Sequence, residues 1–431
     1  MLSLACRYLL LISFFVAYSA HLYAQGRIYA TGDNTDETEF NRIAKSAVRA
    51  KRDLNNLPDA FSIKQYAPEP GDQGNAGTCV AWSSSYAART ISYCIQHLIT
   101  DPAQIKSLRF SPNYVYHYVK QSTDLDCSAG AKVESAMKVL TEKGDVLLSD
   151  NVPDCVPAIS RTLETNAINY SIKAYSALTN SFGVISRNEI LAIKKGISEK
   201  KPIIFSIKCY RSLFNVDQSG IWNIPANDSI VGNHAMCIVG YDDNKNGGSF
   251  EVMNSWGTSW GNKGFGWISY EQLKIFGRFA LELMDRESYD PGTTRSLGNP
   301  KIKGSLGFDL VDESGDSIGS MPASRRFIDP QGNDIADPAK ASFTRYQLLE
   351  QYRAGQRFKI SFTTNAPAFV YIFAVDDQQT ISPLFPYADN VSAAINSTNA
   401  TVYLPSEIKG YRIKPGAKRD QMIVIYSKLP I

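Results

Sequence analysis

Three residues of this sequence have the types and settings that nucleophilic chemistry needs. Cys79 lies in GDQGNAGTCVAWS, His234 in NHAMCIVGY and Asn254 in MNSWGTSWGNKGFGW. A thiol attacks a carbonyl carbon as its thiolate, and a nearby imidazole can take the thiol proton. An asparagine amide can hold that imidazole in one tautomer and one orientation. The three residues together indicate nucleophilic catalysis by a cysteine.

Cys79 is expected in the first turn of a helix. Apolar residues recur after it at i, i+3 and i+4 spacings, which predicts a helix over residues 79–99 with one buried face. The free N–H groups and the dipole at a helix start favour a thiolate. His97 lies too far along this helix to reach Cys79, and His117 has no supporting motif. His234, which we expect to open an apolar strand, is therefore the expected base.

The N-terminus and the composition indicate an exported globular protein. The chain has 431 residues, 44% hydrophobic and 20% charged, which predicts a soluble protein of two domains. The stretch MLSLACRYLLLISFFVAYSAHLYAQ is typical of a secretory signal peptide cut after Ala20 or Ala24, with an uncleaved anchor as the alternative. We expect a secreted or periplasmic protein with no transmembrane segment in the mature chain. A net charge of +3 without a long basic run points away from nucleic acid.

Export also determines what the cysteines can do. Without Cys6 of the signal peptide, six of the seven cysteines remain, and disulfides can form outside the cytoplasm. Because six is an even number, the count leaves open whether Cys79 is free or bridged.

The stretches around these residues resemble the active-site blocks of papain-like cysteine peptidases. The resemblance covers residues 57–283, and NSWGTSWGNKGFGWISY is its most specific part. It implies an α-helical lobe that faces a β lobe, and hydrolysis of peptide bonds through a thioester. Peptides or proteins would be the substrates, with no metal and no cofactor.

The resemblance also implies a role for each matching residue. Cys79 matches the nucleophile, His234 its general acid and base, and Asn254 the residue that orients the imidazole. Gln73 matches the side-chain donor of the oxyanion hole. Trp256 matches the indole that covers the hydrogen bond between histidine and asparagine.

Substrate-binding residues follow from the same resemblance. Ala235 and Ser206 match positions that line the main specificity pocket, and Gly130 matches a residue that contacts the substrate backbone. Ala129 stands where the family has a glycine, so we expect the substrate backbone to be aligned differently there.

One disulfide is expected to differ from the family pattern. The family usually has a cysteine three residues before the nucleophile, bridged to a CNGG-like segment, but Ala76 occupies that position and the segment reads CSAG from Cys127. We expect Cys127 to pair with Cys155, and the alternative is that both are reduced. The other mature cysteines besides Cys79 are Cys94, Cys209 and Cys237. The first and last of these are expected to be buried free thiols, and the second stays unassigned.

The expected architecture is α+β, with a papain-like two-lobe domain followed by a small, mostly antiparallel β-sandwich. The strand, turn and LFP motif around Asp376 and Phe385 resembles a bacterial β-sandwich domain of unknown function that is appended to peptidases and kinases. We expect this domain to bind a protein or an envelope component, or to pack against the catalytic domain. The expected divisions are a signal peptide (1–24), a short lead-in or propeptide (25–56), the peptidase domain (57–285), a linker (286–305) and the β-sandwich (306–431).

Two functions remain open from the sequence. The first is an exported bacterial cysteine peptidase. The alternative is a catalytically inactive papain-like scaffold that binds or adheres at the cell envelope. An inactive scaffold usually loses a catalytic residue, so the presence of Cys79, Gln73, His234 and Asn254 favours the enzyme.

Overall fold

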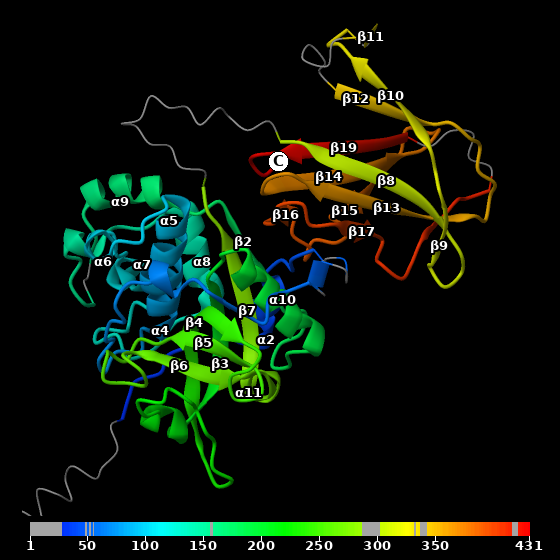
Figure 1. Ribbon diagram of the computed structural model, residues 1–431. Coiled ribbons are helices and arrows are strands. Elements are labelled where there is room, and N and C mark those ends of the chain that lie inside the picture. Colours follow the sequence, from blue (N-terminus) through cyan, green and yellow to red (C-terminus); the bar gives the residue numbers. More distant parts are fainter. Residues whose placement is uncertain are drawn as a thin grey trace, which may run out of the picture. The chain divides into compact units, whose positions relative to one another are not determined.

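The computed structural model of the protein describes residues 28–47, 50, 53–54, 56–155, 158–286, 302–331, 333–336, 343–415 and 421–431 (Figure 1). The expected signal peptide and most of the expected linker lie outside the described residues. In the part that is described, no helix is both long enough and apolar enough to cross a membrane.

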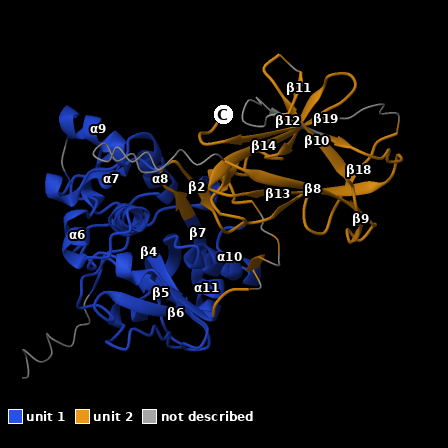
Figure 2. Ribbon diagram, turned by 45° about the horizontal axis from the view of Figure 1, so that its top comes forward, with its two compact units in different colours: residues 1–40, 59–172, 181–281 blue, residues 41–58, 173–180, 282–431 orange. Residues whose placement is uncertain are grey.

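The chain divides into two compact units that are discontinuous in sequence. The first contains the described part of residues 1–40 together with 59–172 and 181–281, and the second contains 41–58, 173–180 and 282–431 (Figure 2). The divisions expected at residues 56, 285 and 305 are linear, so they differ from this grouping. Within the second unit, the backbone at Lys45 forms parallel bridges to both Ala177 and Val391, which joins this early segment to residues much later in the chain.

The helical part of the first unit is built around the helix that Cys79 begins. This helix comprises α4 (Cys79–Ala81), the π-helical η2 (Trp82–Arg89) and α5 (Thr90–Gln96). It ends at Gln96 rather than at Ile99, because Leu98 has a φ of 56°, which an α-helix cannot contain. The other helical elements here are α2 (Glu37–Arg42), α6 (Pro102–Ser107), α7 (Pro112–Val119), α8 (Val133–Glu142), α9 (Arg161–Ala167), η1 (Lys64–Tyr66), η3 (Leu148–Asp150) and η4 (Ile168–Tyr170).

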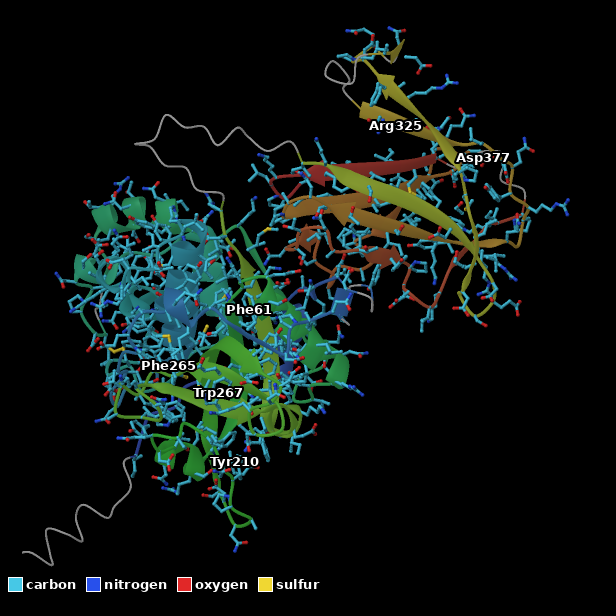
Figure 3. The ribbon with its side chains drawn as sticks, viewed as in Figure 1. Phe61, Tyr210, Phe265, Trp267, Arg325 and Asp377 are labelled. Atoms are coloured by element: carbon cyan, nitrogen blue, oxygen red, sulfur yellow. A yellow bond between two sulfur atoms is a disulfide. The ribbon has the colours of Figure 1, made fainter. Side chains whose placement is uncertain are left out.

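The β part of the first unit is a sheet in the order β7-β3-β4-β5-β6, with β1 paired to β4. Its strands are β1 (Ala60–Ser62), β3 (Ile203–Tyr210), β4 (Ile230–Asp242), β5 (Ser249–Met253), β6 (Phe265–Ser269) and β7 (Gly277–Met284). Figure 3 labels Phe61 on β1 and Phe265 and Trp267 on β6. The sheet is accompanied by η5 (Arg211–Asn215), α10 (Arg187–Ser198) and α11 (Tyr270–Phe276); Ser186 and Ser269 begin the last two as N-terminal caps.

The second unit contains a β-sandwich. One sheet holds β8 (Gly304–Val311), β9 (Ser317–Ser320), β13 (Arg357–Thr364), β17 (Val402–Leu404) and β18 (Tyr411–Arg412). The other holds β14 (Ala368–Val375), β15 (Ile381–Phe385), β16 (Ala394–Ile395) and β19 (Gln421–Ser427). Ile360 and Phe362 of β13 share a buried cluster with Val370 and Ile372 of β14, so the alternating apolar residues of the two sheets face each other.

The remaining strands of the second unit are short. They are β2 (Ala174–Ala177), β10 (Ala323–Ile328), β11 (Asp334–Ile335) and β12 (Phe343–Leu348). The last three form a small antiparallel sheet of their own. The expected α+β class, with an antiparallel β-sandwich at the C-terminal end, is confirmed.

Candidate active site

Cys79 is the first residue of α4, and its side chain is fully buried. Burial, the largest cause, and the negative charge of Asp33 together raise the pKa of its thiol to about 12. The backbone N–H groups of Ala235, Val80 and Gly32 act in the opposite direction, because they donate toward the sulfur. The sulfur therefore lies beside the residue that follows His234, and also beside a residue from the N-terminal end of the described chain.

His234 is held in one orientation by Asn254 and Trp256. Its Nε2 lies 2.7 Å from Asn254 Oδ1, and that oxygen also accepts a hydrogen bond from the backbone N–H of Ser255. Because the amide oxygen accepts, Nε2 carries the proton and Nδ1 is left as a base. Nδ1 is buried and has no hydrogen-bond partner among the described residues. The Trp256 ring stacks on the imidazole, with centroids 4.3 Å apart.

The prediction that a strand begins at His234 is wrong. Strand β4 begins at Ile230, because Gly232 and Asn233 already pair with Cys209 and Lys208 of β3. The imidazole therefore projects from within a paired strand, which is a more rigid support than a strand end.

Burial also acts on the imidazole. It lowers the pKa of His234 to about 4, and the hydrogen bond that the imidazole donates to Asn254 Oδ1 opposes this only in part. Because burial raises the thiol pKa at the same time, both Cys79 and His234 are neutral at pH 7 in this closed state.

Gln73 is positioned by contacts with the loop that carries Asn254. Its backbone N–H donates to the Ser255 carbonyl at 2.8 Å, and its side-chain Oε1 accepts from Ser255 Oγ at 2.6 Å. These bonds fix the amide, so that Nε2 points to the carbonyls of Ala76 (2.8 Å) and Ala30 (3.2 Å). Gln73 Nε2, which the family resemblance assigns to the oxyanion hole, thus donates to carbonyl groups of the chain itself in this structure.

Residues 28–36, which we call the covering segment, lie across these groups. Gly32 N–H donates to the Asn233 carbonyl, and Gly32 O accepts from Ala131 N–H at 2.8 Å. Trp256 Nε1 donates to Ala30 O at 3.0 Å, and the Tyr29 ring stacks on Trp256 at 4.7 Å. The segment therefore contacts the candidate site from the tryptophan to the CSAG loop.

Two glycines allow the covering segment to approach so closely. A Cβ on Gly32 would lie 2.0 Å from Gly77 O, and a Cβ on Gly130 would lie 2.5 Å from Gly32 O. Gly130 also has a φ of +82°, which favours glycine. Gly130, which we expected to contact the backbone of a substrate, thus lies against the backbone of the covering segment.

Ser206 and Ala235 are directly opposite each other on β3 and β4. Ser206 Oγ donates to the carboxylate of Asp33, the residue after Gly32 in the covering segment. The two residues expected to line a specificity pocket therefore lie next to an acidic side chain.

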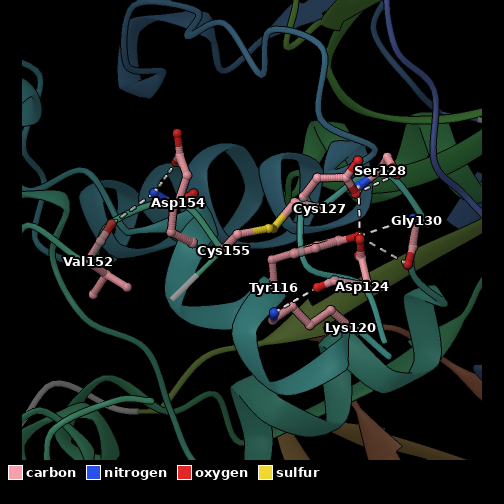
Figure 4. Close-up of a disulfide and its surroundings, with 11 residues drawn as sticks. Tyr116, Lys120, Asp124, Cys127, Ser128, Gly130, Val152, Asp154 and Cys155 are labelled. Atoms are coloured by element: carbon pink, nitrogen blue, oxygen red, sulfur yellow. Dashed lines mark hydrogen bonds between the residues drawn. A yellow bond between two sulfur atoms is a disulfide. The ribbon is translucent and has the colours of Figure 1, made fainter. Parts of the chain in front are cut away.

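The structure joins Cys127 to Cys155, with Cα atoms 5.7 Å apart (Figure 4). Tyr116 supports the same loop, because its hydroxyl bonds Asp124 at 2.7 Å and accepts from Gly130 N–H at 3.1 Å. The Cys127 carbonyl accepts from Gly77 N–H at 2.7 Å, which links the disulfide loop to the loop before Cys79. The free cysteines of the described chain are Cys79, Cys94, Cys209 and Cys237, and all are buried.

Sequence reasoning missed the covering segment and Arg278. Residues 25–56 were expected only as a lead-in or propeptide, and Arg278 carried no motif. The Arg278 guanidinium pairs with Asp33, 245 residues away in the chain, so no local periodicity connects the two. The only available signal was an acid beside a glycine in a polar stretch.

Comparison with known proteins shows the family of the chain. The sequence model described as "Papain family cysteine protease" matches residues 57–277, which is just over half of the chain. A domain of unknown function (DUF4384) matches residues 351–430.

Curated relatives are distant. An uncharacterized peptidase C1-like protein of Acanthamoeba polyphaga mimivirus is 25% identical over 47% of this chain and 64% of its own length. Cathepsin K of Mus musculus is 23% identical over 57% of this chain and 73% of its own length. Among solved structures, xylellain, a cysteine protease from Xylella fastidiosa, is 21% identical with a TM-score of 0.49, and covers 61% of this chain and 98% of its own.

Proposed function

Because the chain belongs to the papain family of cysteine proteases, we propose that it is an exported peptidase that works through Cys79, His234 and Asn254. One observation carries the proposal: Asn254 Oδ1 holds His234 Nε2 at 2.7 Å, and the buried Nδ1 has no hydrogen-bond partner among the residues that the structure describes, as a base needs. The neighbouring residue, Ala235, directs its N–H to the Cys79 sulfur.

The reaction follows from these positions. His234 Nδ1 takes the thiol proton, and the Cys79 sulfur attacks the peptide carbonyl carbon. The C–N bond then breaks, the amine leaves with the proton from the imidazolium, and a thioester remains. Water, deprotonated by His234, hydrolyses the thioester and restores the thiol. Gln73 Nε2 and the Cys79 N–H would stabilise the oxyanion, by roughly 10²–10³ in rate per donor.

The covering segment must leave before a substrate can bind. It is not itself presented for cleavage, because Gly32 directs its N–H toward the sulfur while its carbonyl accepts from Ala131 N–H. A donor group rather than an electrophilic carbon thus faces the nucleophile. The covering segment would therefore keep the enzyme latent, and its departure would let water reach Cys79 and His234.

Export is part of the proposal. It is supported by the N-terminal stretch with its apolar run, and by the Cys127–Cys155 disulfide, which an oxidising compartment preserves. N-terminal sequencing of the exported chain should find a start just after Ala20 or Ala24. We also propose that the C-terminal β-sandwich binds a protein or an envelope component.

The test is active-site labelling with a peptide epoxide, read by peptide mass spectrometry. It uses the unaltered chain and Gly32→Ala, which should unseat the covering segment because of the 2.0 Å clash with Gly77 O. Gly319→Ala is the matched control, because its Cβ would meet nothing within 4 Å.

Label on Cys79 of the Gly32→Ala chain, lost in Gly32→Ala/His234→Ala, is the expected result. An unlabelled Cys79 in the folded Gly32→Ala chain, with no peptide hydrolysis, would contradict the mechanism. The alternative, an inactive scaffold that binds at the envelope, would then take its place.

A further inference from the structure

We propose that this enzyme selects substrates with an acidic side chain, and that Arg278 is the residue that recognises it. The proposal rests on the function proposed above, since it concerns what enters the same site. We call Arg278 and Ser206 the carboxylate site, because both donate to the carboxylate of Asp33.

The contacts of Asp33 are those of a bound carboxylate. Arg278 Nη1 lies 2.5 Å from Asp33 Oδ2, and Ser206 Oγ donates to the same oxygen. The pair is buried, with 2% of Asp33 and 6% of Arg278 exposed. Charge-assisted hydrogen bonds of this kind are roughly twice as strong as neutral ones.

Arg278 depends on the covering segment for its negative partner. Its guanidinium carbon lies 4.9 Å from the Phe182 ring centre and 5.8 Å from that of Phe279. Among the described residues, Asp33 is the carboxylate within ion-pair distance of Arg278. When the segment leaves, an arginine flanked by aromatic rings is left without an anion, and an unpaired charge in such surroundings is unfavourable. A substrate carboxylate would replace the lost partner.

The carboxylate site is close to the nucleophile. Gly32, whose N–H faces the Cys79 sulfur, is the residue before Asp33, and the charge of Asp33 itself raises the thiol pKa. Ser206 is opposite Ala235, which directs its N–H to the same sulfur. A peptide with its carbonyl carbon at Cys79 must therefore place one side chain near Arg278.

After the covering segment leaves, Arg278 has more hydrogen-bond donors available for a substrate carboxylate than it uses for Asp33. Arg278 Nη2 donates to the Thr35 carbonyl of the covering segment, so it becomes available when the segment leaves. A substrate aspartate or glutamate could then accept from both nitrogens, which is the preferred geometry between guanidinium and carboxylate. A lysine or arginine side chain would meet a like charge, and an apolar side chain would leave Arg278 unpaired.

The first experiment profiles cleavage of a peptide mixture by the full-length Gly32→Ala chain. We expect an acidic residue at one fixed position from the cut, preferred at least about tenfold over a neutral one of similar size. Arg278→Glu in the same chain should replace this preference with one for lysine or arginine. Arg161→Glu, a charge reversal of an exposed residue at the start of α9, is the matched control and should leave the profile unchanged.

A second experiment needs no catalysis. A fluorescent peptide with the sequence of residues 28–36, IYATGDNTD, is titrated onto the full-length Cys79→Ala/Gly32→Ala chain. We expect the peptide to bind at least about tenfold more tightly than a control peptide that differs only in having Asn in place of the aspartate at position 33. Equal binding of the two peptides, or no binding of either, would overturn the proposal.

A charge swap between positions 33 and 278 tests the proposal even if the single Arg278 variants fold poorly. Arg278→Glu should unseat the covering segment and speed alkylation of Cys79, whereas Asp33→Arg/Arg278→Glu should slow it again. An enzyme that cuts through Cys79 without acidic preference would contradict only the carboxylate site. A chain that binds the Asp peptide selectively but never cuts would contradict only the proposed function.

Discussion

At the residue scale, the main feature is that one of the two hydrogen bonds donated by Gln73 Nε2 would change its acceptor. Nε2 donates to Ala76 O and to Ala30 O in the closed state, and the second of these bonds would pass to the oxyanion after the covering segment leaves. One side chain would thus serve both latency and catalysis.

Replacement of Gln73 should separate these two roles. In Gly32→Ala/Gln73→Ala, kcat should fall by roughly 10²–10³ relative to Gly32→Ala with little change in KM, because the lost donor acts on the transition state. Steady-state kinetics on a peptide substrate would measure this. A change confined to KM would show instead that Gln73 only binds substrate.

His234 should make opening of the covering segment depend on pH. Burial lowers its pKa from the usual 6.5 to about 4 in the closed state, and solvent should restore it toward the usual value on opening. The open state then binds more protons between these values, so acid favours opening. We expect the equilibrium constant for opening to rise roughly tenfold or more from pH 7 to pH 5.

Hydrogen exchange of residues 28–36 at the two pH values would measure this rise. The same measurement on His234→Ala is the control, and there the dependence should largely disappear. A pH dependence that persists unchanged in His234→Ala would assign it to another group.

At the element scale, the CSAG loop connects the disulfide to the covering segment. The loop supplies the Ala129 and Ala131 carbonyls, which accept from Asn34 Nδ2 at 2.5 Å and Asn34 N–H at 2.9 Å. The disulfide closes a chain segment with a sequence separation of 28. The bond should therefore stabilise both the fold and the closed state.

Cys127→Ser/Cys155→Ser should lower the free energy of unfolding by about 3 kcal/mol, chiefly because the unfolded chain becomes less constrained. Urea unfolding followed by tryptophan fluorescence measures this in the first unit, where all five tryptophans lie. Dithiothreitol should reduce the stability of the unaltered chain and not that of the variant. Equal sensitivity of both chains to dithiothreitol would contradict the assignment.

The elements that carry local signals could be predicted from the sequence, and those made by distant contacts could not. The helix that begins at Cys79 could be predicted from the spacing of its apolar residues. Asn254 and Trp256 could be predicted because they lie in one specific motif. Arg278 had no such signal, because its role depends on Asp33, which is 245 residues away in the chain. Strand β4 was predicted too short for a similar reason, since Gly232 and Asn233 have low strand propensity and are held by pairing with β3.

At the scale of the whole molecule, each compact unit combines segments that are far apart in the sequence. Residues 28–36 pack on the first unit with β3 and β4, and residues 41–58 belong to the second unit with the C-terminal strands. A division into consecutive domains could not show this, because a composition shift along the sequence does not record which segments pair. The covering segment was therefore expected only as a lead-in or short propeptide.

The covering segment also has a consequence for how the enzyme responds to dilution. An inhibitor that belongs to the same chain stays at an effective concentration in the millimolar range, whatever the concentration of the protein. Dilution into a large extracellular volume would therefore not release activity, as it would for a separate inhibitor. Activation would instead need an event that opens the closed state, such as acid, a cut within the segment, or a competing ligand at very high local concentration.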